Sequence, residues 1–169
     1  MSHSDHQRVA SMDWESWEPS IRATLIFIIQ GNQILMIEKK RGLGAGKING
    51  PGGKIDPGET ALQAIIRETQ EEVLVTPHDP QKIGELYFSM SDSPDILCHV
   101  FRAESYDGIL GETDEAVPVW YDLSCIPFDK MWEDDRYWLP HVIEKRTFQG
   151  KFIFDGETML WHEIQLNKI

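Results

Sequence analysis

The sequence predicts an α+β domain with a mixed β-sheet between helices. Segments rich in β-branched and aromatic residues lie before, between and after two segments with helical periodicity, which is the pattern of such a fold. A chain of 169 residues is long enough for one domain with a substantial core. We therefore expect one domain over residues 21–169. Residues 1–20 are polar and lack sustained periodicity, so we expect a flexible N-terminal arm there, whose two tryptophans can dock on the domain.

The first half of the domain is predicted to hold a strand pair, a loop and a helix. Strands are expected over 23–30 and 33–40, because ATLIFIIQ and QILMIEKK flank the turn residues Gly31 and Asn32. Six of the fourteen residues from 41 to 54 are glycine, which predicts a loop that bends sharply or approaches a ligand. Thr60 and Gln63 form a capping-box pattern, and apolar residues then recur at helical spacing as far as Val73. The helix is thus predicted over residues 61–73.

The second half is predicted to be mainly strands with one more helix. Strands are expected over 82–90, 95–104 and 116–123. Asp134 or Asp135 can cap the second helix, in which Pro140 is tolerated within the first two turns. Asp155 and Gly156 separate two further β-rich runs and predict a hairpin. The helices therefore fall between groups of strands.

Composition excludes several classes of protein. The net charge of −12 disfavours binding to a nucleic-acid backbone, which needs clustered cations. The longest apolar run in the first half, from Ala23 to Ile29, is far shorter than a membrane span. Cys98 and Cys125 are too few for a disulfide framework, and no secretory signal opens the chain. We expect a cytoplasmic protein, a monomer or weak dimer, with no membrane and no nucleic-acid partner.

Three glutamates share one narrow arc of the predicted helix. On a helical wheel Glu68, Glu71 and Glu72 lie together, and Glu59 precedes the same end of the helix. A solvated acidic face is the simplest interpretation, since like-charge pairs on a surface cost only about 0.2–0.5 kcal/mol each. The glycine-rich loop beside the arc favours a second interpretation, a site for a hard cation such as Mg²⁺, which prefers carboxylate oxygens.

The spacing of these residues resembles the Nudix box. Gly53, Glu59 and the run Arg67-Glu68-Thr69-Gln70-Glu71-Glu72 stand at the intervals of that motif. The resemblance implies a Nudix-type α/β/α sandwich and Mg²⁺-dependent hydrolysis of a diphosphate linked to another group, with Mn²⁺ as a possible substitute. Leu74 stands where the box has glycine. A glycine there would let the helix end in the left-handed region, which costs any other residue roughly 1–2 kcal/mol.

The resemblance also implies roles for individual residues. The implied metal ligands are Gly53, through its backbone, and Glu68, Glu71, Glu72 and Glu115. The implied catalytic residues are Glu68, Glu71, Glu72, Glu115 and Arg67, of which Arg67 orients a glutamate. The general base is either a glutamate of the box or Glu115.

Outside the box, the chain resembles one branch of this superfamily, the MutT homologues that hydrolyse oxidised purine nucleoside triphosphates. The resemblance lies in KKRGLGAG, KING, GGK and IPFDKMWEDDRYW. The residues that we expect to bind substrate are Asn49, Trp132, Asp134, Asp135, Lys39, Phe88, Trp138 and Thr24. An indole offers a stacking face for a purine, and an amide both donates and accepts hydrogen bonds. Leu43 stands where this branch commonly has an aromatic residue.

Simpler interpretations exist for several of these residues. An Asp-Asp pair often caps a helix, and a tryptophan or a strand phenylalanine often packs in the core. A carboxylate only accepts hydrogen bonds, so reading a purine edge with Asp134 or Asp135 calls for a protonated carboxyl, which burial beside a like charge favours.

We expect hydrolysis of oxidised or modified purine nucleoside triphosphates, such as 8-oxo-dGTP and 2-hydroxy-dATP, to the monophosphate and pyrophosphate. The alternatives are hydrolysis of another nucleoside diphosphate derivative, such as ADP-ribose or a dinucleoside polyphosphate, and a nucleotide-binding module without catalysis. A prenyl diphosphate isomerase would need an additional catalytic acid or cysteine, which the sequence does not identify.

Overall fold

The computed structural model describes residues 1–168, and Ile169, the last residue of the predicted domain, lies outside the described residues. The helices are α1 (His3–Ala10), α2 (Ala61–Val73) and α3 (Asp135–Ile143), with a short 3₁₀ helix at Phe128–Lys130. The strands are β1 (Ile21–Gln30), β2 (Gln33–Lys39), β3 (Ile48–Asn49), β4 (Gly52–Lys54), β5 (Thr76–Pro77), β6 (Gln81–Met90), β7 (Ile96–Ala103), β8 (Tyr106–Asp107), β9 (Ala116–Asp122), β10 (Phe148–Asp155) and β11 (Thr158–Leu166).

Nine of the strands form one mixed sheet. Its main path runs β11-β10-β6-β7-β1-β2-β3, with β4 paired to β1 and β9 paired to β2. The pairs β1–β7 and β6–β10 are parallel, whereas the others are antiparallel. Strands β5 and β8 form a separate small ladder. The predicted α+β class with a mixed sheet is therefore confirmed.

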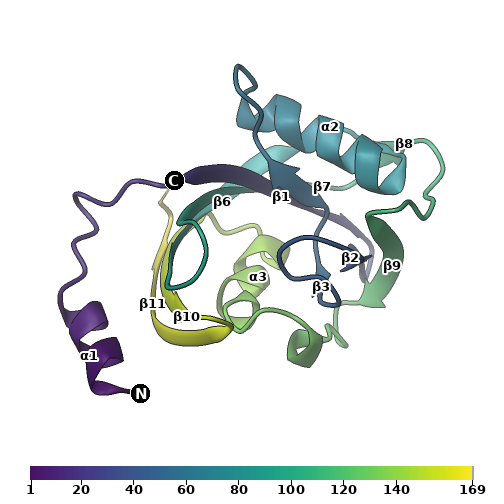
Figure 1. Ribbon diagram of the computed structural model, residues 1–169. Helices are drawn as coiled ribbons and strands as arrows, with labels where there is room; N and C mark the ends of the chain where they lie inside the picture. The colour runs from purple at the N-terminus through teal and green to yellow at the C-terminus, as the bar shows by residue number, and fades with distance from the viewer. Residues whose placement is uncertain (169) are drawn as a thin grey trace.

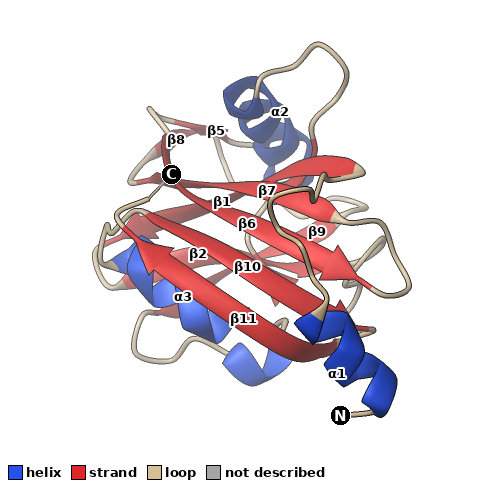
Figure 2. Ribbon diagram, turned by 90° about the vertical axis from the view of Figure 1, so that its left-hand side faces the viewer, coloured by secondary structure: helices blue, strands red, loops and turns tan. Residues whose placement is uncertain are grey.

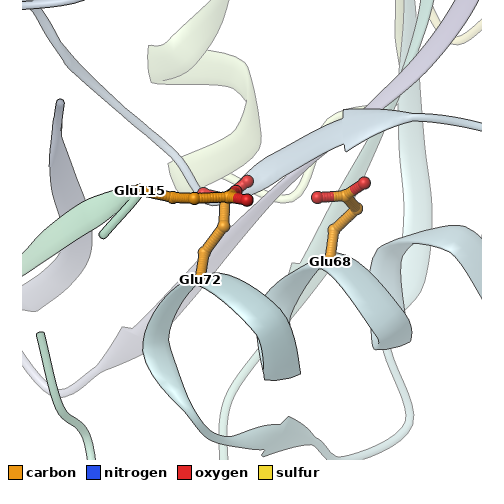
Figure 3. Close-up of side chains that lie close together, drawn as sticks. All are labelled: Glu68, Glu72 and Glu115. Carbon is orange, nitrogen blue, oxygen red and sulfur yellow. The ribbon is translucent and has the colours of Figure 1, made fainter. Parts of the chain in front are cut away.

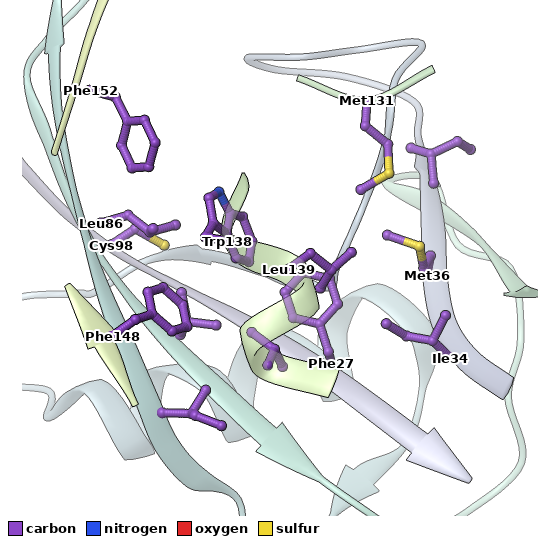
Figure 4. Close-up of a cluster of buried hydrophobic side chains, with 14 of the residues drawn as sticks. Phe27, Ile34, Met36, Leu86, Cys98, Met131, Trp138, Leu139, Phe148 and Phe152 are labelled. Carbon is purple, nitrogen blue, oxygen red and sulfur yellow. The ribbon is translucent and has the colours of Figure 1, made fainter. Parts of the chain in front are cut away.

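Helices cover both faces of the sheet around β1. Ile26 and Ile28 of β1 pack in one buried cluster with Ile65 of α2. Phe27, the residue between them, packs on the other face with Trp138 of α3. Because strand side chains alternate between faces, a strand buried on both faces appears as a continuous apolar run. Figure 1 shows α2 and α3 on opposite sides of the curved sheet, and Figure 4 shows the larger core around Trp138.

Helix α2 has the predicted bounds. The side chain of Thr60 accepts a hydrogen bond from the Gln63 amide, and the Gln63 side chain accepts one from the Thr60 amide, which completes the capping box. The helix ends at Leu74, which has φ +69° and ψ +18°. The chain thus leaves α2 through the left-handed region, even though the residue there is leucine and not glycine.

Two segments differ from the sequence-based expectation. The predicted glycine-rich loop contains β3 and β4, which pair with β2 and β1, so its second half belongs to the sheet. The predicted arm contains α1, because Ser2 and Asp5 form a capping box that starts a helix the apolar pattern does not reveal. Whether the arm and the domain are separate units stays a prediction.

Helix α3 begins next to the aspartate pair, but the pair does not cap it through a side chain. Asp134 has helical dihedral angles, and its side chain makes no capping hydrogen bond. Pro140 lies in the second turn of α3, as expected. Within residues 1–168, no helix has the length and apolar character to cross a membrane.

Candidate active site

Three glutamate carboxylates lie close together between α2 and the start of β9. One oxygen from each of Glu68, Glu72 and Glu115 lies within 4.8 Å of the others. Glu68 and Glu72 are one turn apart on α2, and Glu115 reaches them from the residue just before β9 (Figure 3). Helical spacing places two ligands on one face, and the antiparallel pairing of β9 with β2 brings the third.

The carboxylates repel one another in the absence of a cation. Burial raises the pKa of Glu72 to about 8, and the charges of Glu68 and Glu115 add to this rise, while Lys39 opposes it. Burial also raises the pKa of Glu68, an effect that its hydrogen bond from Arg67 opposes. Burying carboxylates together is unfavourable unless they are protonated or paired with a cation.

The surroundings of Glu68 fit a metal site. A side chain on Gly53 would place its Cβ 2.5 Å from the Glu68 carboxyl carbon, so the glycine allows the carboxylate to pack against the β4 backbone. The Gly53 carbonyl accepts a hydrogen bond of 3.3 Å from the hydroxyl of buried Thr24. An all-oxygen set of three carboxylates with a neighbouring carbonyl suits a hard divalent cation.

Arg67 organises the acidic residues around this cluster. Its guanidinium donates to both oxygens of Glu59, at 2.7 and 2.8 Å, and to Glu68 at 2.8 Å. The same side chain donates to Glu71 at 3.2 Å and to the Lys54 carbonyl at 3.0 Å. The hydrogen bond from Arg67 lowers the pKa of Glu59 to about 2. Arg67 therefore links the loop before α2 to the helix and fixes one side of Glu68.

Glu71 occupies a different position from the other three. Its side chain is half-exposed and bonded to Arg67, outside the group formed by Glu68, Glu72 and Glu115. Glu115 also forms an ion pair of 3.0 Å with Arg41, a residue that the sequence analysis did not single out. The basic run Lys39-Lys40-Arg41 is the one sequence signal that points to this contact.

A cavity of about 150 Å³ opens beside the carboxylate cluster. It is lined by all eight residues predicted to bind substrate: Thr24, Lys39, Asn49, Phe88, Trp132, Asp134, Asp135 and Trp138. Gly53 and Glu72 line the same cavity, which joins it to the carboxylate cluster. The fold thus places the predicted substrate residues around one cavity, with Glu72 and Gly53 of the predicted metal group in its wall.

Asp134 and Asp135 are almost completely buried at the base of the cavity. Asp134 accepts a hydrogen bond of 2.7 Å from the Trp138 indole, so Trp138 both packs in the core and holds the pocket. One carboxyl oxygen of Asp135 has no hydrogen-bond partner. Burial raises the pKa of Asp134 to about 6, and burial next to Asp134 raises that of Asp135 well above its usual range.

Asn49, Trp132 and Leu43 also line the cavity. The Asn49 side-chain oxygen accepts a hydrogen bond of 2.8 Å from the Gly50 amide, which leaves its NH₂ group as the donor end. Trp132 lies edge-on against Phe154 with 5.9 Å between ring centroids, and the Lys47 ammonium lies 5.2 Å from its ring. Leu43 lines the cavity with a half-exposed side chain.

The sequence analysis missed several residues of the pocket. They are mainly apolar side chains from five strands, together with one buried cysteine: Ala23, Leu25, Ile37, Met90, Ile96, Cys98 and Phe154. Cys98 is buried, whereas Cys125, the other cysteine, is exposed. Nothing in their local pattern distinguishes a strand residue that faces a cavity from one that faces the core.

Comparison with known proteins decides the family. The model of the NUDIX domain matches residues 19–142. The chain belongs to the Nudix family. An oxidized purine nucleoside triphosphate hydrolase from Danio rerio is 42% identical over 138 residues, which cover 81% of this chain and 88% of the relative. The corresponding protein from Mus musculus is 38% identical, with 84% and 92% covered.

Solved Nudix structures share the fold. A MutT protein from Bacillus halodurans superposes with a TM-score of 0.78 at 23% identity, over 86% of this chain and 97% of that chain. At this identity the likeness supports the fold. The predicted family, its MutT-homologue branch and the Nudix-type fold are therefore confirmed, as is the class of enzyme, a Nudix hydrolase. Nudix hydrolases generally use a divalent metal.

Proposed function

We propose that this enzyme hydrolyses oxidised purine nucleoside triphosphates, such as 8-oxo-dGTP and 2-hydroxy-dATP, to the monophosphate and pyrophosphate. One observation carries the proposal: the cavity lined by Asn49, Trp132, Asp134 and Asp135 is also lined by Glu72 and Gly53 of the proposed metal site. A purine base bound among Asn49, Trp132, Asp134 and Asp135 would direct its phosphates toward the carboxylate cluster. The named relatives from two vertebrates support the same substrate class.

The proposed pocket recognises the base through the Asn49 amide and the aspartate pair. In this proposal the Trp132 ring stacks on the purine and the Asn49 amide donates to it. A protonated aspartate donates where a carboxylate only accepts, and burial beside Asp134 raises the pKa of Asp135 well above its usual range, which favours its protonated form. An oxidised purine differs from the normal base in where its edge donates and accepts. A buried acid pair can therefore discriminate between the two bases.

Glu68, Glu72, Glu115 and the Gly53 carbonyl are the proposed ligands of Mg²⁺, and Glu71 stays a predicted ligand. The bound cation would offset phosphate charge and orient the attacking water. Arg67 holds Glu68 in place, and Lys39, which lines the cavity next to Glu72, offers a cation to the phosphates. A carboxylate of the cluster accepts a proton from the attacking water. The water oxygen bonds to phosphorus as the phosphoanhydride bond breaks and pyrophosphate leaves. Glu115 is the more exposed candidate for this base.

The test is hydrolysis of a nucleotide panel with Mg²⁺. The panel contains dGTP, 8-oxo-dGTP, 2-hydroxy-dATP, ADP-ribose and a dinucleoside polyphosphate, with Glu72→Gln as the control. We expect pyrophosphate release that favours the modified purines and is lost in the control. Activity confined to ADP-ribose or dinucleotides would reject the base pocket, and binding without hydrolysis would favour the nucleotide-binding module. Preference for Mg²⁺ over Mn²⁺, a monomer or weak dimer, and a cytoplasmic location stay predictions.

A further inference from the structure

The N-terminal arm, residues 1–20, is docked on the strands that carry one wall of the pocket. Most of this arm precedes the part of the chain that matches the family model, which begins at residue 19. Trp14 stacks on Trp161 of β11 with 6.0 Å between ring centroids. Trp17 meets Tyr87 of β6 edge-on at 5.3 Å. Figure 2 shows α1 beside the start of β11, so the arm crosses the edge of the sheet formed by β6, β10 and β11.

Arg8 of α1 ties the ends of two of these strands together. Its guanidinium donates to the Phe154 carbonyl at 2.6 Å and to the Ser89 carbonyl at 2.8 Å. It also reaches the Ser89 hydroxyl at 3.2 Å. Ser89 and Phe154 lie at the ends of β6 and β10, which pair in parallel. The planar fork of an arginine can satisfy carbonyls on two strands at once, whereas a lysine presents a single nitrogen.

The same strand ends carry side chains that line the cavity. Phe88, Met90 and Phe154 all line it, and Phe154 supports the Trp132 ring. Because side chains alternate along a strand, Ser89 lies on the opposite face from Phe88 and Met90. Arg8 therefore holds the backbone of this wall from outside while the wall's side chains face the proposed base.

A second contact of the arm converges on the same wall. The Trp17 indole donates to one oxygen of Asp95 at 3.0 Å, and the other oxygen accepts from the Met90 amide at 2.9 Å. Asp95 thus connects the arm to a residue that lines the cavity. Two independent contacts, through Arg8 and through Trp17, reach adjacent positions of β6.

We propose that the arm braces the base-binding wall of the pocket and that Arg8 is a positioning residue for nucleotide affinity. This inference rests on the proposed function insofar as the bound group is a purine. Arg8 contacts backbone carbonyls on the outer side of the wall, so it acts through Phe154 and the β6 backbone. Its loss affects how firmly the base is held more than the chemistry at the carboxylate cluster.

The experiment compares Arg8→Gln and Arg8→Lys in the full chain, with Arg146→Gln as a matched control. Arg146 forms a surface ion pair with Glu144 and contacts none of the pocket residues named above. Steady-state kinetics give kcat and KM, and calorimetry gives Kd for the monophosphate product. Hydrogen exchange of the Met90 amide in the free protein reports on the wall without any nucleotide.

We expect Arg8→Gln to raise KM and Kd by about tenfold, with kcat changed by less than about threefold, and to speed exchange at Met90. Arg8→Lys should recover only part of the affinity, and Arg146→Gln should match the wild type. Unchanged affinity in Arg8→Gln would overturn the proposal. Full recovery of affinity in Arg8→Lys would also overturn the proposal, because that result would attribute the effect to the positive charge alone.

Failure of the proposed function would be visible separately. If the wild type neither binds nor hydrolyses modified purine nucleotides, the comparison is made with whichever nucleotide of the panel binds most tightly. Weaker binding and faster Met90 exchange in Arg8→Gln would then still support the brace. Faster exchange with unchanged affinity would contradict it, because the wall would have loosened without consequence for the ligand.

Discussion

Arg67 and Glu59 form a bidentate ion pair. Nε and one terminal nitrogen of the guanidinium donate to the two carboxylate oxygens, at 2.7 and 2.8 Å. The remaining terminal nitrogen is thereby aimed at Glu68, 2.8 Å away. Glu59 precedes α2 and Glu68 lies within it, so the arginine fixes a carboxylate of the cluster relative to the preceding loop. This arrangement explains why a glutamate outside the helix belongs to the same site.

Arg67→Lys is expected to lower kcat by about tenfold or more, because a lysine cannot hold Glu59 and Glu68 in one planar fork. Steady-state kinetics and thermal unfolding of the variant test this. The melting temperature should fall by only a few degrees, since the Arg67 side chain is partly buried, with 27% of it exposed. Wild-type kcat in a folded variant would show that the fork does not position Glu68.

Magnesium is expected to stabilise the wild type against heat and to leave Glu72→Gln nearly unchanged. At a concentration of about a hundred times Kd, a ligand that binds only the folded state adds about 2.7 kcal/mol, or roughly 5–10 °C in melting temperature here. Differential scanning fluorimetry with MgCl₂ or EDTA measures the shift. An equal shift in both proteins would place the bound ion away from this cluster.

Asp135→Asn is expected to change the pH dependence of stability. A carboxyl with a raised folded-state pKa binds protons more tightly when folded, so its contribution to the free energy of unfolding falls as pH rises. The fall starts near the ordinary value of 3.8 and continues through the folded-state pKa values, about 6 for Asp134. The stability of Asp135→Asn relative to the wild type should therefore increase between pH 5 and pH 8 in thermal unfolding. A constant difference would mean that the pair is not protonated.

Leu74→Gly is expected to stabilise the protein. Leucine at φ +69° carries a left-handed strain of about 1–2 kcal/mol, which exceeds the entropic cost of glycine, about 0.5–1 kcal/mol. The melting temperature should rise by about 2 °C with unchanged kcat/KM. Leu62→Gly is the matched control, because both leucines are 44% exposed but Leu62 is inside the helix. It should lose about 1 kcal/mol, and destabilisation in both variants would show that side-chain packing outweighs the strain at Leu74.

Much of the fold was predictable because local signals agree with tertiary burial. The continuous apolar run of β1 and the capping box of α2 are visible in the sequence, and both predicted elements are present. The capping box of α1 is equally local, but its helix has no buried residue, so no apolar pattern marks it. Strands β3 and β4 are too short for a periodic pattern and depend on pairing with distant segments.

The candidate site likewise contains residues that local sequence signals predict and residues that depend on the pairing of distant segments. Glu68 and Glu72 are four residues apart on one helix, so spacing alone predicts that they lie together. Glu115 joins them only through the pairing of β9 with β2, and the family resemblance was needed to expect it. Contacts such as Arg8 with Phe154 join segments 146 residues apart, for which the local sequence holds no signal.

The most direct test of the proposed substrate is the ratio of kcat/KM for 8-oxo-dGTP to kcat/KM for dGTP, measured with Mg²⁺ in the wild type and in Asp135→Asn. We expect a ratio of at least about tenfold in the wild type, with a clear fall in the variant, because a site built to bond one base edge rejects another that leaves buried groups unpaired. A ratio near one in the wild type would contradict the assignment of Asn49, Trp132, Asp134 and Asp135 to an oxidised purine.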